Sequence, residues 1–350
     1  MELRDATHFN KLIDGKNIAL YTLRNKKGMT AQFTNYGATL VSLFVKDKHG
    51  PLSDVVLGYD SLDDYLTMKN PYFGRTIGRY GNRIAHGRFT INQKEYALEQ
   101  NDRGHNLHSG SDGFHHCVWE AVPMFKNAIQ FRYTSKDGHG GFPGNLTVKV
   151  TFTLTDNNAL DIDYEATTDQ LTHVNLTHHS YFNLNQDSTQ SIENHTLKID
   201  ADTYLPVDHS GIPLGNLQSV AGTPFDFRNP KNIKKDIAVK HPQLEIGNGY
   251  DHTFVLNGNG LREVCVISEI ESGRIMTVIT NEPGIQFYSG NSISSQPPGK
   301  NGSIYKDRSG FCLESQHFPD TPNRENFPTT LLHPDEMYTS RCIYQFDLID

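Results

Sequence analysis

The run LTVKVTFTL, residues 146–154, decides the fold class of this chain. Apolar and polar residues alternate along the whole run, which begins and ends with an apolar residue. Successive side chains of a β-strand point to opposite faces, so this pattern predicts a strand with one face on a core and the other in water. Residues 156–158, DNN, supply turn chemistry, and alternation resumes over residues 160–166. The two runs therefore predict an antiparallel hairpin.

The same period of two recurs along the chain. It is present at residues 129–133, in the pair REVCVISEI (262–270) and IMTVIT (275–280), and in IQFYSGN (285–291). Helical signals are short: a capping-box pattern at residues 61–64 and a turn or two over 232–240. Alternating strand and helix units are absent from the pattern, which argues against a Rossmann sheet or a TIM barrel. We predict an all-β fold, a large antiparallel β-sandwich with few short helices, in one domain over residues 1–350.

Composition excludes several classes of function. The chain has 350 residues and a formal net charge of -8, with 32 basic residues scattered among 40 acidic ones, so we expect no nucleic-acid partner. Its start lacks the pattern of a signal peptide, and no apolar run is long enough to span a bilayer, so we expect no membrane association. The cysteines, which form no CxxC motif, predict reduced thiols and a cytoplasmic location: Cys117, Cys265, Cys312 and Cys342. No oligomeric state follows from these features.

Two adjacent histidines stand out in NLTHHSYFNL, residues 175–184. If the segment is extended, His178 and His179 point to opposite faces, so only one of them can reach a given site. The same geometry argues against a shared metal ion, as it does for His115 and His116, because zinc needs three or four convergent ligands. Taken alone, either ring is most simply a structural one.

Four further polar clusters fall at predicted strand ends or loops. They are GRYGNR (78–83), NLHSG (106–110), GYDH (249–252) and LESQHFPD (313–320). Each has an ordinary structural interpretation as surface charge, loop cap or turn. Glu314 is different, because it follows Phe311, Cys312 and Leu313, and a carboxylate beside an apolar run requires a partner if it is buried.

Together these segments resemble the aldose 1-epimerase family, also called galactose mutarotase. The resemblance extends over nearly the whole chain and is carried by NYGATL (35–40), IGRYGNRI (77–84), NLHSG (106–110), NLTHHSYFNL (175–184), YDHTFVL (250–256), IQFYSGN (285–291) and LESQHFPDTPN (313–323). It implies a galactose mutarotase-like sandwich, a setting in galactose and hexose metabolism, and the following site residues: Glu314 as general base, His179 as general acid, His108 in support, and Asn82, Arg83, Asp251 and Gln286 binding sugar hydroxyls. It implies no metal and no cofactor.

The chain departs from the family pattern at three places. His178 stands where the pattern has Asn, Ser109 where it usually has Gly, and Tyr80-Gly81 where a small aliphatic pair is commoner. None of these replaces a matched site residue. We expect the departures to bear on sugar preference more than on chemistry.

The implied residues suit anomer interconversion by ring opening and reclosure. A base removes the proton of the C1 hydroxyl while an acid protonates the ring oxygen, and reference pKa values of about 4.3 and 6.5 suit a carboxylate and an imidazole to these roles. Aromatic rings can pack against the sugar. In strands, half of the candidates Tyr181, Phe182, Phe287 and Tyr288 must face the core instead, and we expect Trp119 to be a core residue.

Three other functions compete with an epimerase of free hexoses such as D-galactose and D-glucose. A glycoside hydrolase would use a carboxylate pair, for which Glu314 and Asp251 are candidates. A noncatalytic carbohydrate-binding module would not need Glu314 and His179 together. The runner-up is a sugar-phosphate epimerase of the glucose 6-phosphate type, whose substrate would need positive charge from Arg79, Arg83 or Arg88.

Overall fold

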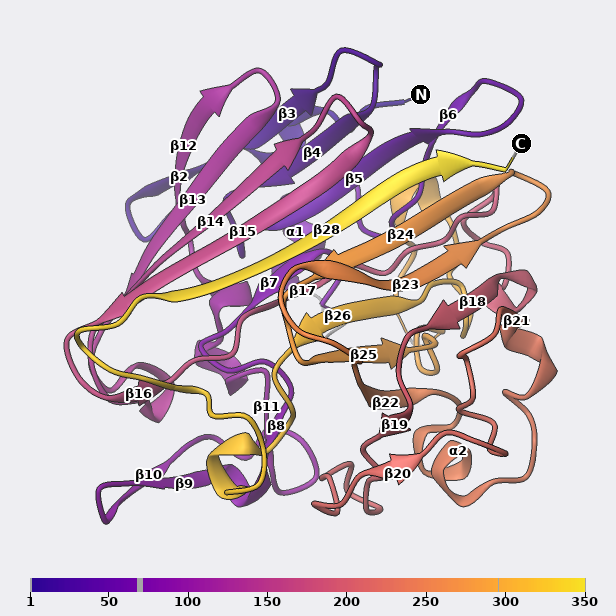
Figure 1. The fold of residues 1–350 in the computed structure, drawn as a ribbon. Coiled ribbons are helices and arrows are strands. Elements are labelled where there is room, and N and C mark those ends of the chain that lie inside the picture. The colour runs from indigo at the N-terminus through magenta and orange to yellow at the C-terminus, as the bar shows by residue number, and fades with distance from the viewer. Residues whose placement is uncertain (1, 68–71, 295, 350) are drawn as a thin grey trace.

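The computed structural model describes residues 2–67, 72–294 and 296–349. Its largest element is a nine-stranded antiparallel sheet, whose long strands run side by side in Figure 1. In spatial order the strands are β12 (Glu120–Phe125), β13 (Ala128–Ser135), β14 (Leu146–Leu154), β15 (Ala159–Thr168), β28 (Tyr338–Leu348), β24 (Arg274–Thr280), β23 (Arg262–Ser268), β18 (Thr196–Ile199) and β21 (Lys231–Asn232).

Two smaller sheets pack against this one. The five-stranded sheet contains β20 (Gln218–Ser219), β19 (Thr203–Tyr204), β22 (Asp251–Val255), β25 (Gly284–Tyr288) and β26 (Cys312–Gln316). The four-stranded sheet contains β3 (Leu20–Arg24), β4 (Thr30–Thr34), β5 (Thr39–Lys46) and β6 (Leu52–Asp54). Short pairs complete the fold: β1 (Lys11–Ile13) with β2 (Lys16–Ile18), β7 (Arg75–Ile77) with β17 (Thr177–His179), β8 (Arg83–Ile84) with β11 (Asn106–Leu107), β9 (Arg88–Ile91) with β10 (Lys94–Ala97), and β16 (Thr172–His173) with β27 (Leu331–Leu332).

The main apolar core lies between these layers. The rings of Phe33 on β4 and Phe152 on β14 are 4.6 Å apart. Tyr344 of β28 reaches across the core and donates a hydrogen bond to the carbonyl of Leu313 on β26 at 2.9 Å. The predicted antiparallel β-sandwich is confirmed.

The alternating run that predicted the fold behaves as expected. Strand β14 spans Leu146–Leu154, each of its apolar residues is buried, and it pairs antiparallel with β15 on one side and β13 on the other. Strands β23, β24 and β25 confirm the other predicted runs. Hydrophobic burial on one face of each strand is therefore what holds the nine-stranded sheet to its partners.

Two short α-helices occur in the described residues. The capping pattern begins α1 (Leu62–Thr67), where the Ser61 hydroxyl accepts from the Asp64 amide and donates to its carboxylate. The predicted turn after Asn232 is a single 3₁₀ turn, Ile233–Lys235. Helix α2 (Pro242–Gly247) was not predicted; His241 caps its start, and Asn248, with φ of 52°, ends it.

A buried arginine joins two sheets. Arg274 on β24 is fully buried, and its Nη1 donates to the carbonyls of Leu184 and Asn185 at 3.0 and 3.1 Å. Its Nη2 donates to the carbonyl of Val45 at 3.3 Å and to the Ser53 hydroxyl. The guanidinium thus satisfies loop and strand-end carbonyls that would otherwise be buried without donors.

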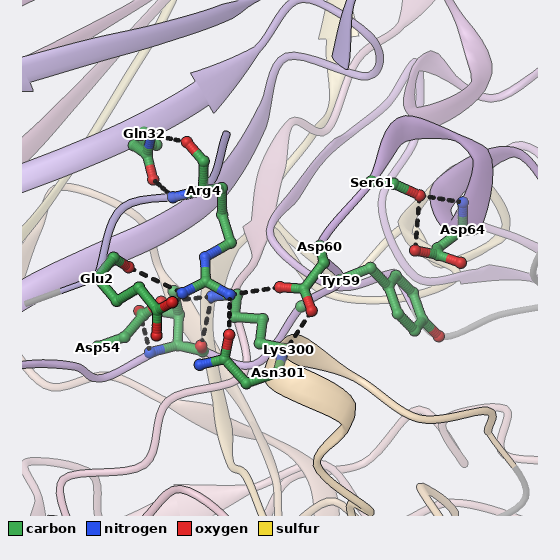
Figure 2. Close-up of polar contacts among 12 residues, drawn as sticks. Glu2, Arg4, Gln32, Asp54, Tyr59, Asp60, Ser61, Asp64, Lys300 and Asn301 are labelled. Atoms are coloured by element: carbon green, nitrogen blue, oxygen red, sulfur yellow. Dashed lines mark hydrogen bonds and ion pairs between the residues drawn. The ribbon is translucent and has the colours of Figure 1, made fainter. Parts of the chain in front are cut away.

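A second ionic network ties the N-terminal segment to the sandwich (Figure 2). The Arg4 amide donates to the Gln32 side chain at 2.8 Å, and Gln32 returns a bond to the Arg4 carbonyl at 3.0 Å. The Arg4 guanidinium pairs with Asp60 and donates to the Asn301 side chain at 2.7 Å. Segments from opposite ends of the chain are therefore held by one side chain.

Lys300 completes this network. Its buried ammonium donates to the Asp54 carboxylate at 2.7 Å and to the Val56 carbonyl at 2.8 Å. Lys300 begins the 3₁₀ turn Lys300–Gly302, which lies between β25 and β26 in the sequence. Because buried charges are costly unless paired, these contacts hold the turn at Lys300 against the segment from Asp54 to Val56.

All four cysteines are free thiols. No helix among the described residues is both long and apolar enough to cross a bilayer.

Replacing Arg274 by Met should lower the free energy of unfolding by about 3 kcal/mol or more, because buried carbonyls lose their charged donor. Urea unfolding followed by circular dichroism measures the change. Arg132→Met, at an exposed position, is the control and should alter stability by less than about 0.5 kcal/mol. Equal losses in the two variants would show that the buried guanidinium has no special role.

Candidate active site

One cavity of about 350 Å³ gathers the predicted site residues. It lies where the five-stranded sheet, α2 and the loops around residues 72–108 meet. All the predicted residues line it: Asn82, Arg83, His108, His179, Asp251, Gln286 and Glu314. The wall also includes Tyr72, Arg103, Leu107, Tyr181, Ile246, Gly247, Asn248, Tyr288, Asn291 and Ser292.

Three neighbouring strands set the floor of the cavity. Gln286 on β25 lies directly opposite Glu314 on β26, and Thr253 on β22 lies opposite Gln286. The Gln286 amide donates to Asp251 Oδ1 at 2.7 Å and accepts from the Thr253 hydroxyl at 2.5 Å. Strand register therefore brings two carboxylates and an amide together, and the hydrogen bonds fix the orientation of that amide.

The two adjacent histidines lie on opposite faces, as predicted. His179 faces the cavity and packs against the rings of Tyr72 and Tyr181, whose centroids are 5.3 and 5.0 Å from its own. His178 points into the core, where its ring lies 5.5 Å from that of Phe152 and its Nδ1 is 3.0 Å from the Ser180 hydroxyl. His178 is thus a core residue.

Glu314 and His179 form a buried pair. Glu314 Oε1 is 3.7 Å from His179 Nε2, and the side chains are only 3% and 6% exposed. Burial, aided by the negative charge of Asp251, raises the pKa of Glu314 well above its usual value, while Arg83 opposes this effect. Burial lowers the pKa of His179 to about 4.

The second carboxylate oxygen of Glu314 is available to a ligand. Among the described residues, Glu314 Oε2 has no hydrogen-bond partner. A buried acceptor without a donor is costly, and a ligand hydroxyl would satisfy it. The pair therefore combines a proton acceptor and an imidazole in one water-poor space.

His108 is held in one tautomer. Its Nδ1 accepts a hydrogen bond from the backbone N–H of Asn82 at 3.1 Å. The backbone N–H of His108 donates to the backbone carbonyl of Asn82, also at 3.1 Å. Burial and the nearby charges of His179 and Arg83 lower its pKa well below the usual value, so the ring is neutral. A neutral imidazole that accepts at Nδ1 carries its proton on Nε2. His108 therefore supplies a hydrogen-bond donor.

This tautomer also bears on metal binding. The potential ligand atoms of His108, His179 and Glu314 lie within 4.8 Å of one another, a donor set that could in principle hold a metal ion. A metal needs the lone pair of an imidazole nitrogen, and the Nδ1 lone pair of His108 already accepts a hydrogen bond while Nε2 is protonated. The arrangement suits hydrogen bonding to a hydroxyl better than metal coordination.

The positive charge at the rim is paired. Arg83 Nε donates to Asp102 at 2.8 Å, and the other oxygen of Asp102 lies 3.5 Å from Arg103 Nε. The other arginines considered from the sequence are elsewhere: Arg79 is buried and donates to the carbonyl of Pro143 at 2.7 Å, and Arg88 pairs with exposed Glu95. Only one of the three sequence candidates lines the cavity.

The aromatic candidates divide as strand alternation requires. Tyr181 and Tyr288 line the cavity, whereas Phe182 and Phe287 are fully buried in the core. Trp119 is a core residue as expected, 1% exposed, with its indole N–H donating to the Phe114 carbonyl.

Several wall residues were not predicted. Tyr72 and Arg103 lie in irregular segments with no periodic pattern. Asn248 is the left-handed cap of α2, and the sequence Gly247-Asn248-Gly249 is the signal that could have located this helix end.

Two departures from the family pattern contact each other behind the cavity. The Ser109 hydroxyl accepts from the Tyr80 amide at 2.8 Å and donates to the Tyr80 carbonyl at 3.1 Å. The Tyr80 phenol donates to the Phe318 carbonyl at 3.0 Å. Neither side chain is part of the cavity wall.

Comparison with known proteins agrees with this geometry. The family model described as aldose 1-epimerase matches residues 19–345. The chain is 44% identical over 315 residues to galactose mutarotase of Homo sapiens, covering 90% of each chain, and 39% identical to aldose 1-epimerase of Escherichia coli, covering 95% of this chain and 96% of the other. Among solved structures, an aldose epimerase homologue from C. elegans superposes with a TM-score of 0.88 at 29% identity, covering 95% of this chain and 100% of the other. Galactose 1-epimerase from Lactobacillus acidophilus gives 0.85 at 30% identity, covering 97% of each.

The raised pKa of Glu314 predicts a pH-dependent cost in stability. Below the pKa of the unfolded chain the carboxyl is protonated in both states, and as pH rises the unfolded state ionises first, so the native state loses stability. Glu314→Gln removes this effect. The melting temperature of the variant minus that of the native protein should therefore be larger at pH 7.5 than at pH 4, as measured by scanning calorimetry. A constant difference would contradict the raised pKa.

Proposed function

Because the chain belongs to the aldose 1-epimerase family, we propose that it interconverts the α and β anomers of free hexoses such as D-galactose and D-glucose. The observation that carries this proposal is the buried pair of Glu314 and His179, 3.7 Å apart in a cavity lined by hydroxyl-binding side chains. An imidazole beside a carboxylate with an unpaired oxygen is what coupled proton transfer at two neighbouring sugar oxygens requires.

The reaction proceeds by ring opening. Glu314, when ionised, takes the proton of the C1 hydroxyl while the neutral His179 ring gives its Nε2 proton to the ring oxygen. The bond between C1 and the ring oxygen breaks, C1 becomes an aldehyde, and the negative charge passes from Glu314 to the imidazole ring until the ring of the sugar closes. Rotation about the C1–C2 bond presents the other face. Ring closure reverses both proton transfers, so each group regains its starting state. No proton is gained or lost in a complete turnover.

The remaining polar residues orient the sugar. His108 donates from Nε2, while Asn82, Arg83, Asp251 and Gln286 bind hydroxyls, each of which must be hydrogen-bonded to offset its desolvation. The rings of Tyr181 and Tyr288 supply apolar surface for the sugar.

The charges at the rim favour an unphosphorylated sugar. Arg83 and Arg103 share Asp102, and the carboxyl groups of Asp251 and Glu314 line the same cavity. A phosphate would need uncompensated positive charge. The sugar-phosphate alternative therefore has less support than a free hexose.

A glycoside hydrolase and a binding module also have less support. Asp251 is engaged by the Gln286 amide rather than free to act with Glu314 as a second catalytic carboxylate. A binding module would have no use for a carboxyl whose burial raises its pKa, since the native state bears that cost.

The proposal includes the organisation and setting of the enzyme. Residues 1–350 act as one domain, because the main core draws on residues from Leu23 to Phe346. The reaction needs no cofactor or metal. Four free cysteines accord with a cytoplasmic location.

Glu314→Gln should reduce catalysis at least about 100-fold, because the amide keeps the shape of the side chain but cannot accept the proton. Polarimetry on freshly dissolved α-D-galactose and α-D-glucose measures the rate above buffer. Glu165→Gln, a half-exposed change on β15, is the control and should leave the rate unchanged. Unaltered turnover in Glu314→Gln would remove Glu314 from the mechanism, and acceleration only with glucose 6-phosphate would favour the phosphorylated substrate.

The adjacent histidines should respond differently to the same change. His179→Asn should lower kcat by about 100-fold or more, since the imidazole faces the cavity. His178→Asn should leave kcat nearly unchanged, because that ring faces the core. Both variants are compared in the polarimetric assay at a temperature well below the melting temperature of each, so that both are folded. The reverse ranking would refute the assignment.

A further inference from the structure

Strand β26 contacts both nitrogens of the His179 imidazole. Cys312 and Glu314 are two residues apart on this strand, so their side chains share a face. Cys312 Sγ lies 3.4 Å from His179 Nδ1, and Glu314 Oε1 lies 3.7 Å from Nε2. The imidazole is therefore bracketed by a thiol on one side and a carboxyl on the other.

The thiol is suited to be a donor. Cys312 is fully buried, and burial together with the negative charges of Glu314 and Asp251 raises the pKa of its thiol well above the usual value. The sulfur therefore keeps its hydrogen. A neutral thiol is a weak hydrogen-bond donor and a neutral imidazole nitrogen is a good acceptor.

The competing arrangement, with the proton on Nδ1, offers that proton either a sulfur or a carbonyl that is already engaged. If Nδ1 carried the proton, it would donate to the weakly accepting sulfur or to the carbonyl oxygen of His179 itself, a contact that also affects the pKa of the ring. That carbonyl already accepts from the Gly74 amide at 3.0 Å. The rings of Tyr72 and Tyr181 pack against the imidazole, with centroids 5.3 and 5.0 Å from its own, and restrict its rotation.

We propose that Cys312 is a positioning residue whose S–H donates to Nδ1 of His179 and holds the resting imidazole as the Nε2–H tautomer. This proposal rests on the proposed function for its catalytic meaning, because only that tautomer of the neutral ring presents a proton to the ring oxygen of a sugar. Glu314 Oε1, which is an acceptor when ionised, lies 3.7 Å from Nε2.

The two cavity histidines then follow one rule. A buried donor occupies Nδ1 in each case: the Asn82 amide for His108 and the Cys312 thiol for His179. Both rings direct Nε2–H at the same cavity, so the site offers two imidazole donors to sugar oxygens. The Nε2–H of His179 is thus set by Cys312, whose side chain does not line the cavity.

The tautomer can be read directly by NMR. Protein with ¹⁵N-labelled histidine gives a long-range ¹H–¹⁵N spectrum in which protonated and unprotonated ring nitrogens are resolved, and His179→Asn identifies the signals of His179. At neutral pH we expect His179 Nδ1 to be unprotonated in the native protein and in Cys312→Ser, whose hydroxyl replaces the donor. Cys312→Ala should shift the ring toward Nδ1–H. A protonated Nδ1 in the native protein, or an unchanged tautomer in Cys312→Ala, would overturn the proposal.

Kinetics provide a second readout. Cys312→Ala should lower kcat roughly 2- to 10-fold, the effect of one neutral hydrogen bond, with KM unchanged, and Cys312→Ser should restore kcat. Cys265→Ala, at another buried free cysteine on β23, is the matched control and should leave both the tautomer and kcat as they are. An equal loss of kcat in Cys312→Ser and Cys312→Ala would count against the hydrogen bond. If even the native protein fails to accelerate mutarotation, the proposed function fails, while the spectrum still decides the tautomer.

Discussion

Alternation of side chains along β26 is the constraint on which the cavity depends. Cys312 and Glu314 point toward His179, while Leu313 between them points into the core and its carbonyl accepts from Tyr344. A slip of one residue in the pairing of β26 with β25 would exchange these faces. Leu313 would then face the cavity, and Cys312 and Glu314 would face the core. The apolar residues of the strand therefore do more than stabilise the sandwich, because their burial fixes which face carries the polar residues.

Burial gives the site its chemistry and also its cost. A carboxyl and an imidazole removed from water interact more strongly with a substrate than exposed groups would, since fewer solvent dipoles screen them. The same desolvation raises the pKa of Glu314 and lowers that of His179, so both charged forms are disfavoured in the native state. The buried Arg274, by contrast, stabilises the native state, because it donates hydrogen bonds to the carbonyls of Leu184 and Asn185. The stability that such contacts contribute offsets the free-energy cost of burying Glu314 and His179 in the cavity.

The sequence predicted the sandwich from period-two patterns, because one-sided burial leaves a direct record in the order of residues, as in β14. It missed α2, a six-residue helix begun by His241 and Pro242, because so short a helix has almost no periodic signal. The site residues were predicted from motif resemblance, and the cavity contains all of them. Tyr72 and Arg103 were missed because irregular segments are placed by tertiary contacts alone. Arg79, a candidate for binding a phosphate, is likewise placed by tertiary contacts: it is buried away from the cavity and donates to the Pro143 carbonyl.

The residues that depart from the family pattern illustrate how such contacts preserve a site. The Ser109 hydroxyl binds both the amide and the carbonyl of Tyr80, and the Tyr80 phenol reaches Phe318, which follows β26. Three segments that carry His108, Asn82 and Glu314 are thereby joined one layer behind the wall. Since Gly at position 109 would leave the Tyr80 amide without this acceptor, the hydroxyl and the segment it binds form one unit. Ser109 and Tyr80 bind each other through these hydrogen bonds, and the polar residues that line the cavity are the ones that the family resemblance predicts.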